Sequence, residues 1–474
     1  MTTITSAPGL EPTRQELDNG AVVLAKASRT TPAVTIHASF EAGTVFEPLE
    51  HASLSYFVSR TIDRGTTTRT ADQIAEELDS RGVSLSVSVN RHLMSLVCTC
   101  LAEDVDAMLA LVADVAMHPT FPEREVATRR AEIITTIRQD QDNPAAVAME
   151  ELLQLLYPGH PYGRRPRGTV ESVDQISASE LQAFHRERFS PATLRLAIVG
   201  DVEPARAITA GARVFGGWRV PAPVPVVLPP VTPLATRQQR VVPMMNKVQA
   251  DIAYGFVTIT RSDALYYAYW LMNTILGQYS MGGRLGDSIR ERQGMAYYVF
   301  SSLDANAVPG PLIVRAGVNA GNVERALASI DEEMVKMAES GPTDREITDT
   351  RQYLIGSMPR QLETNSGIAN FLQMVEFFNL GLDYDVRLPG ILQQVTREQV
   401  HEAARRSLDP ARAAVVIAGP YDPSARRPRA GLPRSSSTST SRSSIRGPRS
   451  RATATPASAA VTVSMSIPRG FTMR

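Results

Sequence analysis

Residues 53–66 read Ser53-Leu54-Ser55-Tyr56-Phe57-Val58-Ser59-Arg60-Thr61-Ile62-Asp63-Arg64-Gly65-Thr66, and this segment is expected to begin as a helix. In a helix, Tyr56, Ser59 and Arg60 stand at positions i, i+3 and i+4 and share one face. A phenol and a guanidinium are poor metal ligands compared with imidazole, and a hydroxyl is a poor general base at neutral pH. These three side chains are therefore poor candidates for holding a metal ion.

The segment resembles the zinc helix of insulinase/pitrilysin-type peptidases, which reads G-L-A-H-F-L-E-H-M-L-F-x-G-T. In that family two histidines bind zinc and the glutamate between them activates water. Those three positions are Tyr56, Ser59 and Arg60 here. The third family ligand, a downstream glutamate, falls on Thr136, and a supporting acid falls on Arg129. The resemblance implies a peptidase fold that has lost its zinc.

The likeness covers most of residues 12–422 through further short motifs in family order. These are Leu17 to Val23, Ala42-Gly43-Thr44, Phe121-Pro122-Glu123, Asp142-Asn143-Pro144 and His160-Pro161-Tyr162-Gly163. The seven histidines are scattered, and His401-Glu402 begins an H-E-x-x-H pattern that lacks its second histidine. No replacement zinc site is expected in this chain.

A second motif, residues 282–299, resembles the family pattern G-G-x-x-S-R-L-F-x-x-L-R-E-x-x-G-L-A-Y-x-V. In the family an arginine and a tyrosine of this motif face the zinc across a closed chamber, and they correspond to Arg290 and Tyr297. A guanidinium can bind a peptide carbonyl, and a phenol can donate a hydrogen bond to a developing oxyanion. Tyr298 is the expected packing residue, although a shift of one residue in register would exchange the two tyrosines.

Two parts of the chain look like copies of one unit. A short helix pattern, a Ser-Pro-Ala or Asp-Pro-Ala turn and an apolar strand end both parts, with the strands at Leu194–Gly200 and Ala413–Gly419. The Pro- and Val-rich residues 219–235 are the expected linker. The predicted domains are therefore residues 10–218, with the degenerate zinc site, and 236–422, with the Arg/Tyr pair.

Local patterns predict the elements of the first domain. Thr70 and Gln73 form a capping box, Gly82 ends the helix, and residues 83–89 and 96–100 alternate as half-buried strands. Residues 105–117 form an amphipathic helix that ends before Pro119. The predicted fold class is α+β: two homologous domains, each an antiparallel or mixed sheet with helices packed on one face, as in a duplicated metallohydrolase.

The neutral net charge conceals an asymmetry. Ten of the 49 basic residues follow Asp422 and no acidic residue does, so residues 1–422 carry 39 basic and 49 acidic side chains, a net charge of −10. Residues 424–474 are rich in Ser, Arg, Pro and Thr, which predicts a disordered tail. Contact with nucleic acid or another acidic surface is the alternative for this tail.

Composition places the chain among ordinary globular proteins, with 43% hydrophobic residues and no long apolar run.

Cys98 and Cys100 alternate in one strand and cannot easily bridge each other, so buried free thiols are expected. The alternative is that the two cysteines form a metal-binding pair with His92. The N-terminus lacks the features of a signal peptide. A cytoplasmic location is the default expectation.

The resemblance implies a two-domain subunit that closes a chamber with a homologous partner. The chain is predicted to be the non-catalytic, substrate-binding subunit of a heterodimeric zinc metallopeptidase, with extended peptide as substrate and no membrane partner. It would hold no cofactor itself, and zinc is expected in the partner. The alternatives are a structural or peptide-binding scaffold without a proteolytic role, and a zinc peptidase that acts alone.

Overall fold

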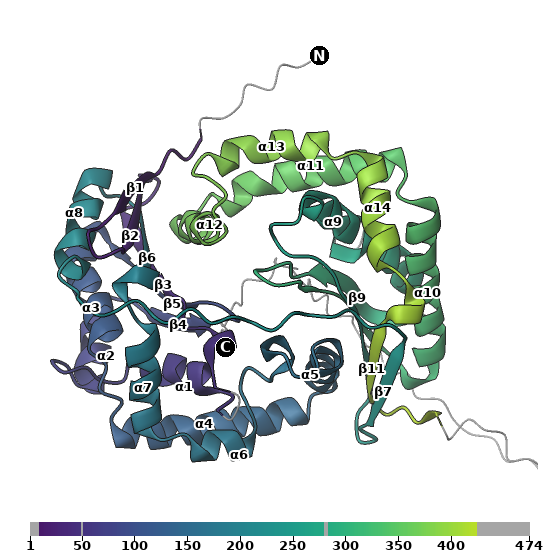
Figure 1. The fold of residues 1–474 in the computed structure, drawn as a ribbon, viewed down its shortest axis with the longest axis horizontal. Coiled ribbons are helices and arrows are strands. Elements are labelled where there is room, and N and C mark those ends of the chain that lie inside the picture. The colour runs from purple at the N-terminus through teal and green to yellow at the C-terminus, as the bar shows by residue number, and fades with distance from the viewer. Residues whose placement is uncertain (1–8, 49–50, 279–282, 424–474) are drawn as a thin grey trace, which may run out of the picture. The chain divides into compact units, whose positions relative to one another are not determined.

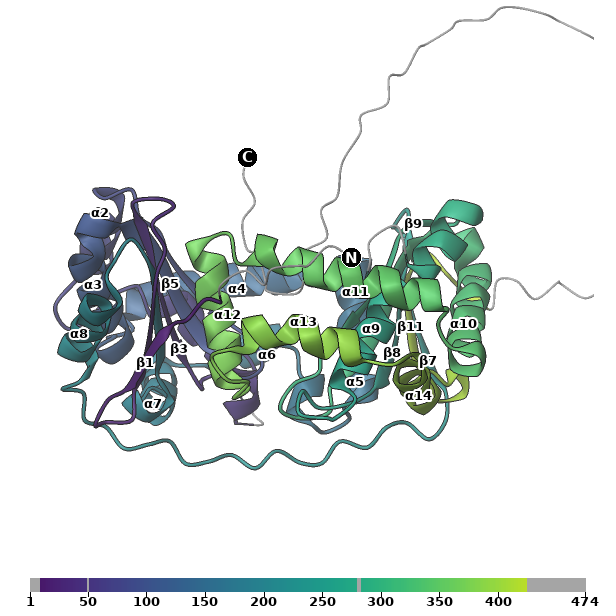
Figure 2. The same cartoon turned by 90° about the horizontal axis from the view of Figure 1, so that it is seen from above.

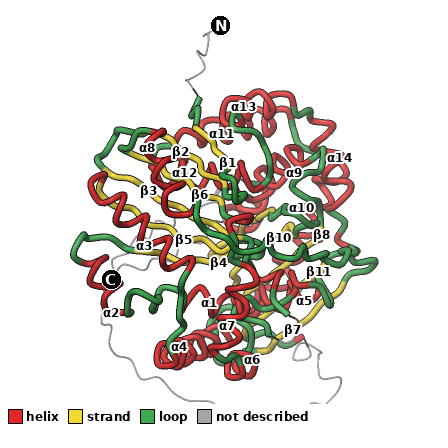
Figure 3. The backbone as a smooth tube through the Cα atoms, turned by 60° about the vertical axis from the view of Figure 1, so that its left-hand side comes forward, coloured by secondary structure: helices red, strands yellow, loops and turns green. Residues whose placement is uncertain are grey.

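The structure is a computed structural model that describes residues 9–48, 51–278 and 283–423. Within these ranges the chain has the predicted α+β fold, with two β-sheets and many helices (Figure 1). The strands of the two sheets can be followed in Figure 3. The predicted tail, residues 424–474, and Gly282 of the second motif lie outside the described residues.

The first sheet has six strands in the order β1-β2-β6-β3-β5-β4. These strands are β1 (Thr13–Glu16), β2 (Val22–Ala27), β3 (Ala33–Phe40), β4 (Leu85–Val89), β5 (Met94–Leu101) and β6 (Arg195–Gly200). The helices of this half are α1 (Leu54–Thr61), α2 (Ala71–Asp79), α3 (Val105–Met117), α4 (Glu123–Gln141), α5 (Pro144–Leu156), α6 (Val170–Gln175), α7 (Ala178–Arg188) and α8 (Pro204–Phe215).

The second sheet has five strands in the order β7-β11-β8-β10-β9. These strands are β7 (Gln238–Pro243), β8 (Ala250–Val257), β9 (Ala296–Leu303), β10 (Pro311–Val318) and β11 (Ala414–Gly419). The helices of this half are α9 (Tyr266–Asn273), α10 (Val323–Ser340), α11 (Asp344–Gln361), α12 (Asn365–Phe377), α13 (Tyr384–Gln394) and α14 (Arg397–Ser407), with a π-helical segment at Gly286–Arg292.

The two sheets repeat one topology. In the first, β2 runs parallel to β6, and β6, β3, β5 and β4 then pair antiparallel. In the second, β7 runs parallel to β11, and β11, β8, β10 and β9 pair antiparallel. The shared order confirms the duplication that the sequence repeat predicts, while the domain boundaries near residues 218 and 236 stay a prediction.

Helices of its own half cover one face of each sheet, as predicted. In the first half, Val23, Ile36 and Leu196 on three neighbouring strands are fully buried in one core together with Leu109 and Val112 of α3. Burying one such side chain contributes about 1.5–3 kcal/mol. A matching core in the second half covers β8, β10 and β11.

The other face of each sheet is covered by a helix from the other half, which the sequence does not reveal. Helix α12 packs on β3 and β6 of the first sheet, and α5 packs on β8 and β11 of the second (Figures 1 and 2). Leu372 of α12 is fully buried in a cluster with Leu24, and Leu152 of α5 is fully buried in a cluster with Val416. Each half therefore contributes one helix to a hydrophobic core of the other half.

Polar contacts fix α12 on the first sheet. The Gln373 side chain is buried and accepts a hydrogen bond from Ser39 Oγ at 2.6 Å. Its amide nitrogen donates to the carbonyl oxygens of His37, at 2.7 Å, and Arg195, at 2.9 Å. Because all these groups find partners, the buried amide is not left with the cost of an unsatisfied polar group.

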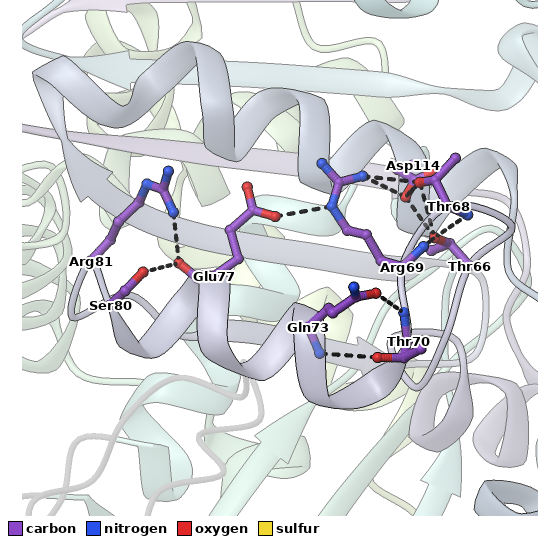
Figure 4. A network of polar contacts seen from close by, with 9 residues as sticks. All are labelled: Thr66, Thr68, Arg69, Thr70, Gln73, Glu77, Ser80, Arg81 and Asp114. Carbon is purple, nitrogen blue, oxygen red and sulfur yellow. Dashed lines mark hydrogen bonds and ion pairs between the residues drawn. The ribbon is translucent and has the colours of Figure 1, made fainter.

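The elements predicted between residues 70 and 117 are confirmed. Thr70 and Gln73 form the capping box of α2, with nitrogen–oxygen distances of 2.9 and 3.2 Å (Figure 4). Gly82 follows with φ +63°, a conformation that glycine adopts without strain. Strands β4 and β5 follow, and α3 has the predicted bounds of 105–117.

Asp114 of α3 fastens the loop between α1 and α2. Its carboxylate accepts hydrogen bonds from Thr66 Oγ1 at 2.7 Å, Thr68 Oγ1 at 2.8 Å and Arg69 Nη1 at 2.7 Å (Figure 4). Arg69 also donates to Glu77 of α2 at 2.9 Å. These bonds fix the end of the segment that carries Tyr56, Ser59 and Arg60.

The predicted linker is a long segment without helix or strand between α8 and β7 (Figure 2). Arg188 of α7, only 2% exposed, ties it to the first half by donating to the carbonyl oxygens of Val224, at 3.3 Å, and Glu41, at 3.0 Å.

Cys98 and Cys100 are buried free thiols, as expected. His92 Nε2 is hydrogen-bonded to the Tyr162 hydroxyl at 2.6 Å, so this nitrogen is not directed at the thiols. None of the helices in the described ranges has the length and apolar character that a membrane span requires.

Candidate functional site

Helix α1 carries the three positions that the sequence assigns to a lost zinc helix. Ser59 Oγ donates to the carbonyl oxygen of Tyr56 at 2.7 Å, so the serine hydroxyl is bound to its own helix. The Tyr56 ring lies 5.6 Å from the guanidinium carbon of Arg167. Arg60 Nη2 lies 3.9 Å from a carboxylate oxygen of Glu132 on α4.

The fourth position, Thr136, lies on α4, which contacts α1. Thr136 Oγ1 donates to the carbonyl oxygen of Glu132 at 3.0 Å. Glu132 is one turn before Thr136 and contacts Arg60, and Asp140 is one turn after it and binds Arg167, which lies over Tyr56. Thr136 therefore lies on α4 between two residues, Glu132 and Asp140, that are linked to Arg60 and Tyr56 of α1. All four positions lie at the contact between α1 and α4.

The side chains at this contact do not fit zinc. They offer a phenol, two hydroxyls already bonded to backbone carbonyls, and a guanidinium, whereas zinc in proteins prefers imidazole, thiolate and carboxylate. Arg129 adds a second guanidinium, 2.5 Å from Glu132. Across the described residues, no group of three or more His, Cys, Asp or Glu side chains is arranged to hold a metal ion.

The backbone at the start of α1 keeps a conformation typical of glycine. Ser53, the residue before α1, has φ +90° and is fully buried, and its Oγ has no hydrogen-bond partner. The pattern that the segment resembles has glycine here. A non-glycine residue in the left-handed region costs about 1 kcal/mol or more.

We therefore expect Ser53→Gly to raise the free energy of unfolding by about 1 kcal/mol, because it removes both the strain and the unpaired hydroxyl. Denaturant unfolding would measure this gain. Ser53→Ala is the matched control. It removes the hydroxyl but keeps the Cβ atom, and with it the strain of the left-handed backbone conformation. A Gly variant less stable than the Ala variant would contradict this account.

Glu47 binds the backbone at the start of the same helix. It is 5% exposed, and its carboxylate accepts hydrogen bonds from the backbone N–H groups of Ser53, at 3.2 Å, and Ser55, at 2.8 Å, and from the Ser55 hydroxyl. Burial raises the pKa of Glu47 to about 7, because loss of hydration outweighs these hydrogen bonds and the nearby Arg164.

This pKa predicts how stability changes with pH. Between the usual carboxyl pKa and about 7, the folded state binds a proton that the unfolded state has lost, so the contribution of Glu47 to stability falls as pH rises through this window. Relative to Glu47→Gln, the wild type should lose on the order of 3 kcal/mol between pH 4.5 and 8. Unfolding of both proteins across this range tests the prediction, and parallel stability curves would contradict it.

Arg290 and Tyr297 lie in the second half. Arg290 belongs to the π-helical segment Gly286–Arg292, its side chain is 44% exposed, and its Nε lies 3.8 Å from Glu291. Tyr297 is on β9 and is 59% exposed, among the most exposed aromatic residues of the described chain. Gly294 between them has φ +61°, which explains a glycine at this turn.

A β-bulge sets the direction of Tyr297. On β10, Gly317 pairs with Tyr298 and the next residue, Val318, pairs with Ala296, so Tyr297 is the extra residue. Ala296 and Val299 both pack against the core of the second half. The two tyrosines between them therefore lie on the opposite face, the one that α5 covers, because a bulge re-aims a side chain. The two tyrosines therefore do not point to opposite faces of the sheet, as they would in a regular strand, and no shift in register is needed to place Tyr297 on this face.

Tyr298 is the packing residue of the two, as expected. Its hydroxyl donates to Asp251 of β8, and its ring crosses Gly317, where a Cβ atom would lie 2.5 Å from Tyr298 Cε1. Burial and the Asp251 carboxylate raise the pKa of Tyr298. Asp251 belongs to none of the sequence motifs, although an acid in the otherwise apolar strand Ala250–Val257 is a signal that could have found it.

The fold and these positions define a duplicated peptidase-like protein whose metal-binding positions carry other side chains. Residues 22–170 match the family model described as "Insulinase (Peptidase family M16)", and residues 175–354 match the one described as "Peptidase M16 inactive domain". The chain belongs to the insulinase family, peptidase family M16.

Relatives and solved structures agree with this assignment. The chain is 27% identical over 380 residues to an uncharacterized zinc protease of Mycobacterium leprae, with 78% of this chain and 83% of that protein covered. A peptidase M16 inactive domain from Pseudomonas fluorescens is similar in structure, with a TM-score of 0.80, 25% identity, and coverage of 87% of this chain and 98% of that one. A protease from Helicobacter pylori shares the fold, with a TM-score of 0.80 at 15% identity, over 87% of this chain and 100% of that one.

Proposed function

We propose that this chain is the non-catalytic, substrate-binding subunit of a heterodimeric zinc metallopeptidase. The observation that carries the proposal is a contrast between the halves. In the first half, a phenol, two hydroxyls and a guanidinium occupy the four family ligand and base positions. In the second, Arg290 and Tyr297 are retained, and a bulge brings Tyr297 to the face that α5 covers.

The two retained residues have distinct tasks in this proposal. The Arg290 guanidinium donates hydrogen bonds to a backbone carbonyl of the bound peptide and so holds the substrate in place. The Tyr297 phenol donates to the oxyanion that forms when the amide is attacked. A homologous partner with an intact zinc helix would hold the metal, and peptide hydrolysis would take place there. The peptide would bind in extended form along a sheet edge.

The test compares the chain alone with the chain paired. We expect the purified chain to cleave no peptide and to retain no stoichiometric zinc after dialysis. Co-expression with a homologue that carries an intact H-x-x-E-H helix should give a complex with one zinc ion and peptidase activity. Stoichiometric zinc or brisk cleavage by the chain alone would contradict the proposal.

The same experiment separates the proposal from a scaffold role. A scaffold would pair with a homologue without changing its activity, whereas a substrate-binding subunit should raise it, because the partner lacks its own Arg/Tyr donors at the closed site. The cytoplasmic location expected from the sequence stays a prediction.

A further inference from the structure

His37 lies at the contact between α12 and the first sheet. Its neighbours on β3, Ile36 and Ala38, are buried in the core of the first half. His37 therefore faces the opposite side of the sheet, together with Ala197, its pairing partner on β6. Ala197 is buried in one cluster with Leu372 of α12. The helix that covers His37 is thus α12, which comes from the second half of the chain (Figures 1 and 2).

The imidazole of His37 is buried without a hydrogen bond. The residue is 6% exposed, and neither ring nitrogen has a hydrogen-bond partner of normal geometry among the described residues. Burial lowers the pKa of His37 to about 4, and Asn370 of α12 only partly offsets this effect. The paired residues on the neighbouring strands, Val97 and Ala197, carry no charge. A proton on this ring would therefore be a buried charge without a counter-ion.

The charged side chains around this contact have partners of their own. Glu376 of α12 binds Arg14 of β1, with a nitrogen–oxygen distance of 2.9 Å. Arg195 of β6 binds Glu41, also at 2.9 Å. Neither carboxylate is therefore free to stabilise a protonated His37.

A second buried histidine, His92, also packs against α12. Its ring centroid lies 5.8 Å from that of Phe377, and its Nε2 is hydrogen-bonded to the Tyr162 hydroxyl. Burial lowers the pKa of His92 to about 4. The charged or titratable groups that act on it are Arg91, Asp304, Glu41 and His160. His92 thus has a hydrogen-bond partner and carboxylates in its surroundings, both of which His37 lacks.

We propose that the contact between α12 and the first sheet is acid-sensitive and that His37 makes it so. At neutral pH the ring is uncharged and α12 packs on the sheet. In acid, an open form in which the ring reaches water binds a proton that the closed form excludes, so the equilibrium shifts toward the open form. Opening frees α12 from β3 and β6 and separates one of the cores that the two halves share. The inference does not depend on the proposed function.

The test is hydrogen–deuterium exchange of the full chain at pH 7 and pH 5, followed in peptides that cover α12 (Asn365–Phe377). Dividing each rate by the intrinsic exchange rate at that pH gives the opening equilibrium of the helix. With an ordinary histidine pKa in the open form and a pKa of about 4 in the closed form, opening should increase about 20-fold from pH 7 to pH 5. Peptides of α3, which packs on the other face of this sheet, serve as the internal reference and should not follow the increase.

Three variants assign the effect to His37. His37→Leu replaces the ring by an apolar side chain, so the opening of α12 should change less than about threefold between the two pH values. Asn370→Asp keeps His37 but adds a carboxylate beside the ring, which favours the charged form, so α12 should open less at pH 5 than at pH 7. His185→Gln is the matched control and should respond like the wild type. His185 is 7% exposed and also has a pKa lowered to about 4, but it is hydrogen-bonded to Ala116 of α3 rather than packed on α12.

Equal normalised exchange of α12 at pH 7 and pH 5 in the wild type would overturn the inference. An increase that both His37→Leu and Asn370→Asp leave unchanged would also overturn it. If His37→Leu fails to fold, the direction of the acid response in Asn370→Asp decides alone, because this variant keeps the ring and changes only its neighbour. None of these measurements involves zinc or a partner subunit, so the proposed function is tested separately.

Discussion

Tyr297→Phe is expected to lower kcat of the paired peptidase by about 10²-fold with little change in KM. The substitution removes one hydroxyl and keeps the ring, and loss of a single oxyanion donor typically costs 10²–10³ in kcat. The exposed position of Tyr297 and the bulge that turns it to the α5 face make it available for this contact. Steady-state kinetics of the complex with one peptide substrate measure the effect.

Arg290→Ala should act mainly on KM, because a contact with the substrate backbone is present before the transition state is reached. Tyr56→Phe is the matched control, since Tyr56 stands at a family ligand position but contacts only Arg167 of its own half, through its ring and a 3.5 Å hydrogen bond from Arg167 Nε to its hydroxyl. It should leave kcat within about twofold. If Tyr56→Phe and Tyr297→Phe reduce kcat equally, the tyrosine of the second half has no special role.

Leu152→Ala is expected to lower the free energy of unfolding by about 3 kcal/mol, through lost burial and the cavity that remains. Leu152 is fully buried where α5 of the first half meets the second sheet. Gly255 of β8 allows the close approach: a Cβ atom there would lie 3.2 Å from Leu152 Cδ2. Chemical denaturation followed by circular dichroism gives the difference.

The exchanged helices also predict the form of the transition. Leu372→Ala, at the equivalent contact of α12 with the first sheet, should cost a similar amount, and both variants should unfold in a single step because each core needs the other half. Val386→Ala, at a side of α13 that is 49% exposed, should change stability by less than about 0.5 kcal/mol. Two separate transitions, with only one shifted by each variant, would show that the halves are independent.

Much of the architecture is predictable from local pattern. The capping box at Thr70 and Gln73, the helix at 105–117 and the strand alternation around them depend on near neighbours, and the structure confirms each. The exchange of α5 and α12 is not predictable in the same way. An apolar stripe on a helix predicts that this face is buried. It does not indicate which of two sheets with the same topology the face will pack against.

In the candidate site, too, some features are predictable from the sequence and others depend on the three-dimensional structure. Family spacing alone finds Tyr56, Ser59, Arg60 and Thr136, and the structure places them at one contact between α1 and α4. The direction of Tyr297 depends on a bulge, and a bulge is defined by the partner strand rather than by the sequence around it. The contact of Asp251 with Tyr298 is not predictable from the sequence, because the two residues lie on different strands, β8 and β9.

The exchanged helix α5 has a consequence for how the protein is made. During synthesis α5 leaves the ribosome long before the strands it must cover, β8 and β11, and β11 begins only at Ala414. Until then its apolar face has no native partner, and such surfaces are prone to aggregation. Because β11 lies in the interior of the second sheet, between β7 and β8, that half reaches its final form only after Gly419 has left the ribosome. Newborn chains of this protein should therefore depend on a chaperone, and ribosome-stalled fragments that end before residue 414 should remain sensitive to protease in their second half.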